Sequence, residues 1–471
     1  MRLPEKYVNK MKGLLGDDYD AYESSLNEPL NHALRVNTLK ISVEDFLKIS
    51  PFELNPVPWT DNAFYYDASL FTPSKHPFYY AGLYYLQEPS ATLPAATIPI
   101  EEGDRVLDIC AAPGGKSTEL AARLAGSGIL VSNDISASRL KALQKNVEAY
   151  GVRNVIITCE SPERLSEHFG AYFDKILIDA PCSGEGMFRK STSMVSAWEQ
   201  NGNEKFAAIQ RQILKEVSSM LRPGGTILYS TCTFDPIEDE DQVEYLLSLD
   251  KSLKILEIRK HEGFVPGNTD WCHVENPHKE LEYTMHLFPH RIKGEGHYVA
   301  LIGSDEELAD DDKRYSGISE YRSKGYREVP EIEEFLSHVS GINRKNLEMG
   351  GDKLFLIPDG CPDVKGLRIM RQGVYLGELK KKRFEPSQSF AMILTSEDFD
   401  NAISLKSDGN AVSKYLRGET LDTDMIESEG TDVSGVKNGW VLVCVDRFPL
   451  GFGKVNNGVI KNKYLPGWRM V

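Results

Sequence analysis

The sequence predicts an α/β fold in which helices cover a mostly parallel β-sheet. In the middle of the chain, short runs rich in Val, Ile and Leu alternate with stretches whose apolar residues recur at helical spacing. This alternation is typical of parallel strands joined by crossover helices. A glycine loop after the first run, within residues 106–117, marks a strand-to-helix turn where a ligand can approach the backbone.

The expected elements follow in chain order. Strands are expected within "RVLDIC", "GILVSND", "NVIIT", "KILIDA" and "TILYST", each a short β-rich run. Between them, "KSTELAARLAG" and "SRLKALQKNVEAYG" are expected to be helices, with Gly151 ending the second. A third helix is expected in "EKFAAIQRQILKEVSSMLRPGG", ending at Pro223. "EGHYVALIG" can add a late strand, one that could run antiparallel.

Smaller modules are expected on both sides of this domain. The strand-like "HALRVNTLK" and a segment dense in aromatic residues favour a small N-terminal α+β extension. The acidic run "SDEELADDDK", Ser304 to Lys313, is interpreted as a solvated linker. Beyond it, a hairpin around Gly373 and another within residues 440–469 indicate small β-rich modules. The four expected domains are residues 1–92, 93–303, 304–390 and 391–471.

Composition limits the classes of function. The net charge of −16 opposes broad binding to polyanions, because Lys and Arg contacts to phosphate supply most of the non-specific affinity for nucleic acids. The charge is uneven, since residues 361–471 hold 16 basic against 14 acidic residues. Local basic patches, and not the net charge, must therefore decide whether the chain binds a nucleic acid. There is no apolar run of about eighteen residues and no signal-peptide pattern at the start. We therefore expect a soluble cytoplasmic protein, with a monomer as the simplest assumption.

Two of the seven cysteines stand directly after predicted strands. Cys182 follows "DKILIDAP", and Cys232 lies in "YSTCTF". The set lacks the paired spacing of a disulfide framework or a zinc cluster. A lone strand-end cysteine is more often a small buried hydrophobe than a nucleophile. Two of them, after Asp-Ala-Pro and Ser-Thr in a ligand-binding domain, favour catalysis instead. Packing is the default role for Cys159, Cys272, Cys361 and Cys444.

The glycine loop predicts a nucleoside-containing cofactor. "VLDICAAPGGKS" places Pro113, Gly114 and Gly115 between a strand and a helix. "ILVSNDIS" places Asp134 after the next strand, where a carboxylate can accept hydrogen bonds from both ribose hydroxyls. The loop is neither the GxGxxG fingerprint nor the phosphate loop GxxxxGK(S/T), which weakens dinucleotide and nucleoside triphosphate interpretations. S-adenosylmethionine is favoured on this spacing, with a structural turn or another nucleotide as the alternatives.

Together, these stretches identify a family by resemblance. "DICAAPGGKS", "NDIS", "DAPCSGEGMFRK" and "YSTCTF" resemble the successive signature motifs of the Sun-related RNA 5-methylcytosine methyltransferases. The whole chain, including "LRVNTLK", "QEPSA", "PHRIKGEGHYVA" and "LGELKKKRFEPS", is similar to the bacterial branch that acts on small-subunit ribosomal RNA. The resemblance implies a class I Rossmann-like S-adenosylmethionine methyltransferase domain, an N-terminal RNA-binding extension and small β-rich C-terminal modules of the PUA-like type.

The resemblance also implies catalytic roles. Carbon 5 of cytosine is a poor nucleophile, and a thiolate that adds at carbon 6 converts the ring to an enamine that can attack a methyl group. By resemblance, Cys232 is the attacking thiol and Cys182 promotes resolution of the adduct. Asp179 is expected to hydrogen-bond ring nitrogen 3 and the amino group of the base. Lys116 is expected to lower the thiol pKa or to hold the phosphate or base.

The remaining site residues are carried over in the same way. Arg139 matches a family position that supports the cofactor site, and Glu160 occupies the acidic position near the adenine, where many relatives have Asp. Asp239 departs from the family pattern, because relatives usually show Asn between two acidic residues. The expected cofactor contacts are Cys110, Ala111, Ala112, Pro113, Gly114, Gly115, Lys116, Asp134, Arg139, Glu160 and Asp179. The expected RNA contacts are Arg35, Asn37, Phe188, Arg189, Lys190, Lys380, Lys381, Lys382 and Arg383.

The expected function is S-adenosylmethionine-dependent methylation of cytosine carbon 5 in 16S ribosomal RNA, free or within the small subunit. One alternative is a transfer RNA cytosine-5 methyltransferase, which the same motifs would serve. The other is a catalytically silent RNA-binding assembly factor. The C-terminal modules favour ribosomal RNA, and the intact Cys232, Cys182, Asp179 and Asp134 argue against the silent factor.

Overall fold

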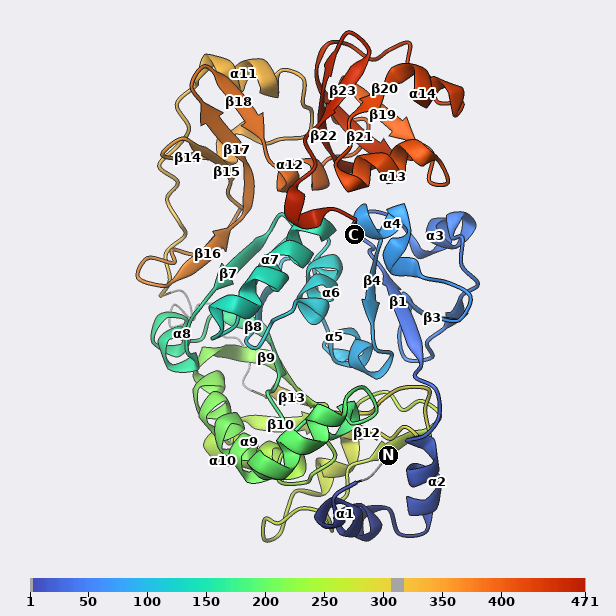
Figure 1. Cartoon of the computed structure of the whole chain (residues 1–471). Helices are drawn as coiled ribbons and strands as arrows, with labels where there is room; N and C mark the ends of the chain where they lie inside the picture. The colour runs from blue at the N-terminus through green and yellow to red at the C-terminus, as the bar shows by residue number, and fades with distance from the viewer. Residues whose placement is uncertain (1–2, 306–316, 471) are drawn as a thin grey trace.

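Four β-sheets organise the chain, and the largest holds the predicted α/β domain (Figure 1). The computed structural model describes residues 3–305 and 317–470. The predicted linker, Ser304 to Lys313, therefore lies almost entirely outside the described residues. Within those residues, none of the helices is both long enough and apolar enough to span a bilayer.

The central sheet has a parallel core, as predicted. Its strands are β5 (Arg105–Asp108), β6 (Ile129–Asn133), β7 (Val155–Thr158), β8 (Phe173–Asp179), β9 (Leu221–Thr231), β10 (Leu253–Leu256), β11 (Phe264–Pro266), β12 (Met285–Leu287), β13 (His297–Ser304) and β16 (Ile369–Gln372). They lie in the order β11-β12-β13-β9-β8-β5-β6-β7-β16, with β10 paired to β13. The five predicted strands β5 to β9 run parallel, and β13, the predicted late strand, runs antiparallel to β9. The chain order reverses between β5 and β8, where parallel sheets form a crevice for ligands.

Helices cover both faces of this sheet (Figure 1). They are α5 (Leu93–Thr97), α6 (Gly115–Arg123), α7 (Ala137–Tyr150), α8 (Pro162–His168), α9 (Thr192–Met220) and α10 (Glu240–Leu249). Successive side chains of a strand point to opposite faces, so the two faces have separate cores. Val106 joins the core that contains α6 and α7, whereas its neighbour Leu107 joins the core that contains α8, α9 and α10.

Local sequence sets some helix ends, and sheet pairing sets others. Gly151, with a left-handed φ of 75°, ends α7 as predicted. The predicted end of the third helix at Pro223 is wrong. This helix, α9, ends at Met220 because the chain from Leu221 onwards already pairs with β8. It also begins earlier than predicted, and Gly202 interrupts its helical dihedrals with a φ of 67°.

The N-terminal extension is α+β, as predicted, and wraps around the central domain (Figure 1). It has helices α1 (Glu5–Leu15), α2 (Tyr19–Ser25), α3 (Val43–Ile49) and α4 (Pro77–Tyr80), and a sheet of β1 (His32–Val36), β2 (Asn55–Pro56), β3 (Ala63–Tyr66) and β4 (Tyr84–Gln87). Helices α1 and α2 lie at one end of the molecule, where Tyr7 packs against Phe188 of the central domain. The sheet lies apart from these helices and shares a core with the last domain, with Phe78 packed against Phe448.

Two further sheets complete the chain as small β-rich modules. The first contains β14 (Leu347–Gly350), β15 (Lys353–Leu356), β17 (Val374–Lys380) and β18 (Arg383–Pro386). The second contains β19 (Ala402–Leu405), β20 (Leu421–Asp422), β21 (Gly439–Val445), β22 (Phe448–Asn456) and β23 (Val459–Asn462). They are accompanied by α11 (Pro330–Leu336), α12 (Gln388–Met392), α13 (Asn410–Arg417) and α14 (Thr423–Ser428). The hairpin predicted within residues 440–469 is present, and β21, β22 and β23 pair in succession.

The predicted hairpin around Gly373 is wrong. β16 pairs antiparallel with β7 at the edge of the central sheet, whereas β17 pairs with β15. Gly373 is the crossing between the two sheets, where its φ is 62° and a Cβ would lie 2.1 Å from the Leu356 carbonyl oxygen. The actual hairpin turn joins β17 to β18 at Lys381 and Lys382. Strand β16 therefore ties the C-terminal β-rich modules to the central sheet.

Two residues predicted to contact RNA, Arg35 and Asn37, are buried instead. Arg35 Nε lies 2.8 Å from Glu119 Oε2 of α6, and Nη1 donates to the Gly115 carbonyl at 2.7 Å. The Asn37 side-chain amide donates to the Tyr150 carbonyl at 3.0 Å. Both residues lock the N-terminal sheet onto α6 and α7, so the prediction that they hold RNA is corrected.

Arg35→Ala is expected to lower stability, because it leaves the Glu119 carboxylate buried without its cation. The two side chains are only 1% and 7% exposed, and removing one partner of a buried ion pair costs about 3–5 kcal/mol. The midpoint of thermal unfolding should therefore fall by several degrees. Lys48→Ala, which removes an exposed ion pair with Glu44, is the matched control and should leave the midpoint almost unchanged. Equal midpoints for the two variants would contradict the role of Arg35.

Candidate active site

The glycine loop lies at the carboxyl end of β5 and opens into the first turn of α6. Gly114 precedes the helix with a left-handed φ of 110°, and a Cβ there would sit 2.9 Å from Leu143 Cδ1 of α7. Gly115 is similarly tight, since a Cβ would lie 3.1 Å from the Tyr85 ring of β4. The loop is therefore pressed between α7 and the N-terminal sheet, and the first turn of α6 supplies backbone amides that no helical carbonyl uses.

Asp134 follows β6, as predicted, and is buried. Its carboxylate accepts hydrogen bonds from the Ala112 amide at 3.3 Å and from the Ser136 amide at 2.8 Å. Arg139 Nη1 lies 3.2 Å from Asp134 Oδ2. Three predicted cofactor residues thus lie in direct contact, beside the loop that also contains Cys110, Ala111 and Pro113.

Glu160 already has a partner in this structure. It is buried at the end of β7, where it accepts a hydrogen bond from the Arg368 amide at 2.6 Å and lies 3.3 Å from the Arg368 guanidinium. Arg368 directly precedes β16, so this pair fastens the C-terminal β-rich modules to the predicted cofactor side of the sheet. An adenine contact would have to share this carboxylate.

Asp108, which sequence reasoning missed, ends β5 below the glycine loop. Its Oδ2 accepts a hydrogen bond from the Ser117 hydroxyl at 2.6 Å, and its Oδ1 is buried with no hydrogen bond among the described residues. Burial raises the pKa of Asp108 to about 7. A buried acceptor without a partner, close to Asp134 and to the amides of α6, fits the amino and hydroxyl groups of an amino-acid-linked nucleoside.

Asp179 ends β8 on the other side of the topological reversal and is 34% exposed. Lys116 Nζ lies 2.7 Å from its Oδ2, and His297 Nε2 lies 3.8 Å from its Oδ1. Burial raises the pKa of Asp179, but the Lys116 ammonium and His297 lower the pKa by more, so the carboxylate stays ionised. The charge of Lys116 is thus directed at a carboxylate rather than at a thiol.

The two strand-end cysteines lie side by side. Cys182 Sγ and Cys232 Sγ are 3.2 Å apart, and the Cys232 amide donates to Cys182 Sγ at 3.3 Å. Both are free thiols, only partly buried. The hydrogen bond with Cys232, burial and the nearby Glu238 raise the pKa of Cys182 well above its usual range. Cys182 is therefore held as a thiol, and its hydrogen can stabilise a thiolate at Cys232.

A buried polar network that sequence reasoning missed fixes the loops that carry the cysteines. Glu238 Oε2 accepts hydrogen bonds from the Ser183 amide at 2.9 Å and the Gln210 side chain at 3.0 Å. Ser183 Oγ lies 2.8 Å from Thr233 Oγ1, which ties the two loops to each other. Burial raises the pKa of Glu238 to about 7. Glu238 stands beside Asp239 in an acidic run of the sequence, but its partners come from distant segments.

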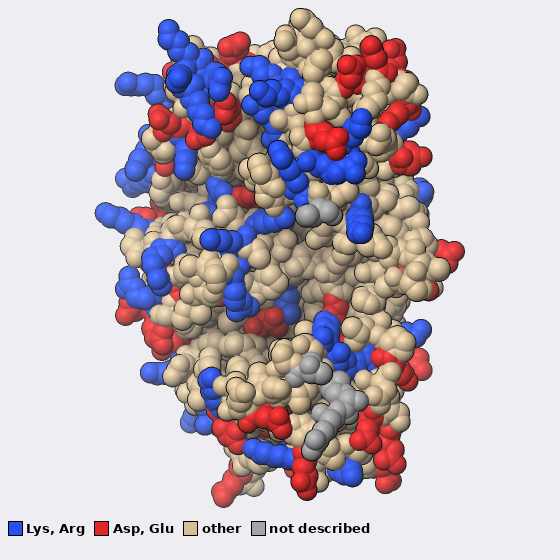
Figure 2. Space-filling model, viewed as in Figure 1, with Lys and Arg blue, Asp and Glu red and all other residues tan. Residues whose placement is uncertain are grey.

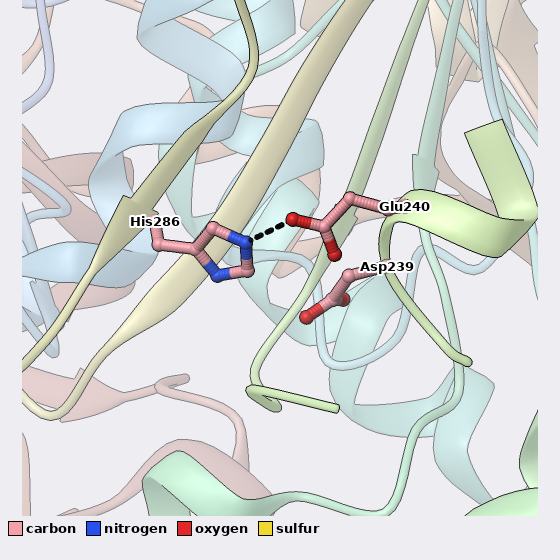
Figure 3. Close-up of side chains that lie close together, drawn as sticks. All are labelled: Asp239, Glu240 and His286. Carbon is pink, nitrogen blue, oxygen red and sulfur yellow. Dashed lines mark hydrogen bonds and ion pairs between the residues drawn. The ribbon is translucent and has the colours of Figure 1, made fainter. Parts of the chain in front are cut away.

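A second buried cluster lies behind the strand that leads to Cys232 (Figure 3). Asp239 accepts a hydrogen bond from the Thr231 hydroxyl at 2.6 Å, and Glu240 Oε1 lies 2.7 Å from His286 Nε2. Within the described part of the chain, Asp239, Glu240 and His286 are the one trio of possible metal ligands within 4.8 Å of one another. Burial and the adjacent Glu240 raise the pKa of Asp239 well above its usual range, which favours the neutral carboxyl. A neutral carboxyl offers both a donor and an acceptor, which explains how Asp can stand where Asn is usual.

The residues predicted to hold RNA near the active-site loop are mostly buried. Phe188 packs in the core with the N-terminal helices, and Arg189 forms a buried ion pair with Glu295 at 2.7 Å. Their predicted RNA contacts are therefore corrected, and Lys190 is exposed. Lys380, Lys381, Lys382 and Arg383 are exposed at the β17–β18 turn. Figure 2 shows Lys and Arg gathered over this part of the surface, although Glu385 pairs with both Lys380 and Arg383.

Family comparisons cover almost the whole chain. The family described as "16S rRNA methyltransferase RsmB/F" matches residues 95–303, and the "N-terminal domain of 16S rRNA methyltransferase RsmF" matches residues 3–89. The "RsmF rRNA methyltransferase first C-terminal domain" matches residues 333–394, and the "Methyltransferase RsmF PUA domain" matches residues 402–470. The chain belongs to the RsmF family.

Individual relatives agree with this assignment. The chain is 31% identical over 489 residues to ribosomal RNA small subunit methyltransferase F of Erwinia tasmaniensis, covering 98% of this chain and 95% of the relative. It is 30% identical over 476 residues to the protein of the same name from Vibrio parahaemolyticus, covering 98% and 96%.

Solved structures show the same fold. A methyltransferase homolog protein from Pyrococcus horikoshii has a TM-score of 0.54 at 30% identity, covering 61% of this chain and 91% of that one. NSun6 from the same organism, solved with SFG, has a TM-score of 0.54 at 22% identity and covers 64% and 99%, a likeness that shows the fold alone. This RsmF-family chain is thus an RNA methyltransferase with a Rossmann-like domain and a PUA domain. S-adenosylmethionine is its cofactor and supplies an electrophilic methyl group.

Asp134→Ala is expected to weaken S-adenosylmethionine binding at least about tenfold, or 1.4 kcal/mol. The change removes the buried acceptor that we propose for the ribose hydroxyls, and it removes the carboxylate that pairs with Arg139. Calorimetric titration of the purified protein with S-adenosylmethionine measures the effect. Asp67→Ala, a change at an exposed carboxylate of the N-terminal extension, is the control. Wild-type affinity in Asp134→Ala would contradict this role.

Proposed function

We propose that this chain methylates carbon 5 of cytosine in 16S ribosomal RNA through a covalent adduct with Cys232. The observation that carries the proposal is the pair of thiols, 3.2 Å apart, just beyond the carboxyl ends of β8 and β9 and beside the ionised Asp179. Relatives that align over almost the full chain bear the name ribosomal RNA small subunit methyltransferase F, which supports the substrate class.

The chemistry of cytosine gives each of the two thiols a task in this proposal. The Cys232 thiolate adds to carbon 6, and the ring becomes an enamine whose carbon 5 can accept a methyl group. The proton on carbon 5 must then leave, and the bond between sulfur and carbon 6 must break. The distance of 3.2 Å between its sulfur and the attacking sulfur supports a role for Cys182 in this release.

Asp179 and Lys116 orient the base in this proposal. The target nucleotide must leave its stack before a thiol can reach carbon 6, and enzymes read a flipped base through its Watson–Crick edge. An ionised Asp179 can accept hydrogen bonds from the exocyclic amino group of cytosine. Lys116 Nζ, 2.7 Å from Asp179 Oδ2, keeps that carboxylate ionised. The glycine loop, Asp134 and Arg139 would hold the cofactor on the opposite side.

The proposed RNA contacts are restricted to exposed cations. They are Lys190 beside the active-site loop and the β17–β18 turn, where the basic surface in Figure 2 lies. Contacts to phosphate position an RNA strand without reading its sequence. The proposal includes a single copy of the chain acting in the cytoplasm on ribosomal RNA or on the small subunit.

Methyl transfer from labelled S-adenosylmethionine tests the proposal. The acceptors are free 16S ribosomal RNA, small subunits and bulk transfer RNA, and the products are digested to nucleosides for identification. We expect 5-methylcytidine from 16S ribosomal RNA or small subunits, and none from transfer RNA. Label in transfer RNA alone would preserve the chemistry and overturn the substrate. A protein that binds the cofactor but labels no acceptor would support a silent assembly factor.

A further inference from the structure

His297 is a buried residue of the site whose ring nitrogens have no hydrogen-bond partner. It is 2% exposed, and neither Nδ1 nor Nε2 has a hydrogen bond among the described residues. Its Nε2 lies 3.8 Å from Asp179 Oδ1, too far for a hydrogen bond. Burying a polar group without a partner costs free energy. A ligand group bound next to Asp179 would supply the missing partner.

Strand register places His297 beside the attacking cysteine. β13 runs antiparallel to β9 with Tyr298 opposite Thr231, so His297 and Cys232 are the next residues along the two strands. Side chains alternate along a strand. Tyr298 packs against His286 in the buried cluster, with 4.6 Å between ring centroids. His297 therefore faces the other way, toward Asp179.

The backbone before His297 is held from two sides. The Gly296 amide donates to Ser90 Oγ of the N-terminal extension at 3.1 Å. Gly296 has a φ of 114°, and a Cβ there would lie 2.3 Å from the Phe234 ring. The backbone that carries the imidazole is thus held in place before any substrate binds, and such preorganisation favours catalysis by a side chain.

Addition of a thiolate to cytosine creates a need for a proton at ring nitrogen 3. As the bond between sulfur and carbon 6 forms, the π-electron pair of the carbon 5–carbon 6 double bond moves to the carbon 4–carbon 5 bond. The π-electron pair of the carbon 4–nitrogen 3 double bond moves onto nitrogen 3, which must then take up a proton. Asp179 has none to give, because the Lys116 ammonium lowers the pKa of its carboxyl and keeps it ionised. Lys116 is itself bound to the other carboxylate oxygen, at 2.7 Å.

We propose that His297 is a catalytic residue that hydrogen-bonds cytosine nitrogen 3 and gives it a proton as Cys232 adds to carbon 6. Asp179 Oδ1 then accepts from the amino group while His297 Nε2 donates to nitrogen 3, so that the pair reads the Watson–Crick edge. When carbon 5 takes the methyl group, the carbon 4–nitrogen 3 double bond forms again and the proton returns to the imidazole. This assignment moves the nitrogen 3 contact from Asp179 to His297. It rests on the proposed function, because it needs a cytosine in the site.

RNA that carries 5-fluorocytosine tests the inference, since fluorine cannot leave carbon 5 as a proton and the adduct with Cys232 accumulates. His297→Leu should slow adduct formation by about 10²–10⁴, the usual contribution of a general acid. Its affinity for S-adenosylmethionine and its thermal midpoint should match the wild type. His297→Gln, which can donate a hydrogen bond but cannot give up a proton, should also be slow. Imidazole added to His297→Ala should restore part of the rate.

His290→Leu is the matched control. The ring nitrogens of His290 are likewise buried with no hydrogen bond among the described residues, but Nε2 lies 4.0 Å from Asp18 Oδ2 of the N-terminal extension. Its variant should form adduct at the wild-type rate. A wild-type rate in His297→Leu or His297→Gln, or a folded His297→Ala on which imidazole has no effect, would overturn the inference and leave the proposed function standing. A wild-type protein that forms no adduct with this RNA would overturn both.

Discussion

Cys232→Ala is expected to abolish methylation of cytosine, with a loss of turnover on the order of 10⁴-fold or more, because the change removes the proposed nucleophile. S-adenosylmethionine should bind as in the wild type, since the proposed cofactor residues lie in the loops after β5 and β6. Incorporation of labelled methyl groups into 16S ribosomal RNA measures the effect. Cys272→Ala, a change at another partly buried free cysteine, is the control and should retain activity. Full activity in Cys232→Ala would contradict the covalent mechanism.

Cys182→Ala is expected to trap the covalent intermediate. The variant keeps the attacking sulfur but loses the thiol that lies 3.2 Å from it and that we propose promotes release. Protein and RNA should therefore migrate together as a slower band on a denaturing gel under turnover conditions, while wild-type protein leaves no such band.

The double variant Cys182→Ala/Cys232→Ala distinguishes the two sulfurs. Its gel should show no adduct, because no attacking thiol remains. An adduct that persists in Cys232→Ala and disappears in Cys182→Ala would show that the roles are reversed. No adduct in any variant would argue against the assignment of Cys182 to release.

The parts of the fold that sequence predicted are those determined by local pattern. Strands β5 to β9 are short apolar runs, and Gly151 ends α7 through its own backbone conformation. The errors arose where a distant segment decided the outcome. The sequence around Gly373 resembles a hairpin turn, but β16, the strand before Gly373, pairs with β7 and so belongs to another sheet than the strand after it. The chain after Met220 leaves its helix early because it pairs with β8.

The residues of the candidate site also fall into those that local sequence predicts and those whose role depends on distant segments. Asp134, Asp179 and the two cysteines were predictable from motifs, because each follows directly from a strand in the sequence. Arg35 was misjudged, because a cation in a strand gives no sign that Glu119 of another domain will pair with it. The partners of Glu238 could not be predicted from local sequence either.

His297 shows most clearly the limit of predicting a site residue from local sequence. The sequence leaves both a substrate contact and a capping or core role open for His290 and His297. The place of His297 beside Cys232 depends on the register of β13 against β9, and its distance from Asp179 depends on the order of strands in the sheet. Neither is visible before the sheet is assembled.

The most direct test of the central claim is bisulfite sequencing of small-subunit ribosomal RNA and transfer RNA from the host, with the gene intact, deleted, and restored as wild type or Cys232→Ala. The account predicts one or more cytosines of 16S ribosomal RNA that resist conversion when the wild-type gene is present and are converted when it is deleted or replaced by Cys232→Ala. An unchanged 16S pattern, or a loss of protection confined to transfer RNA, would contradict it.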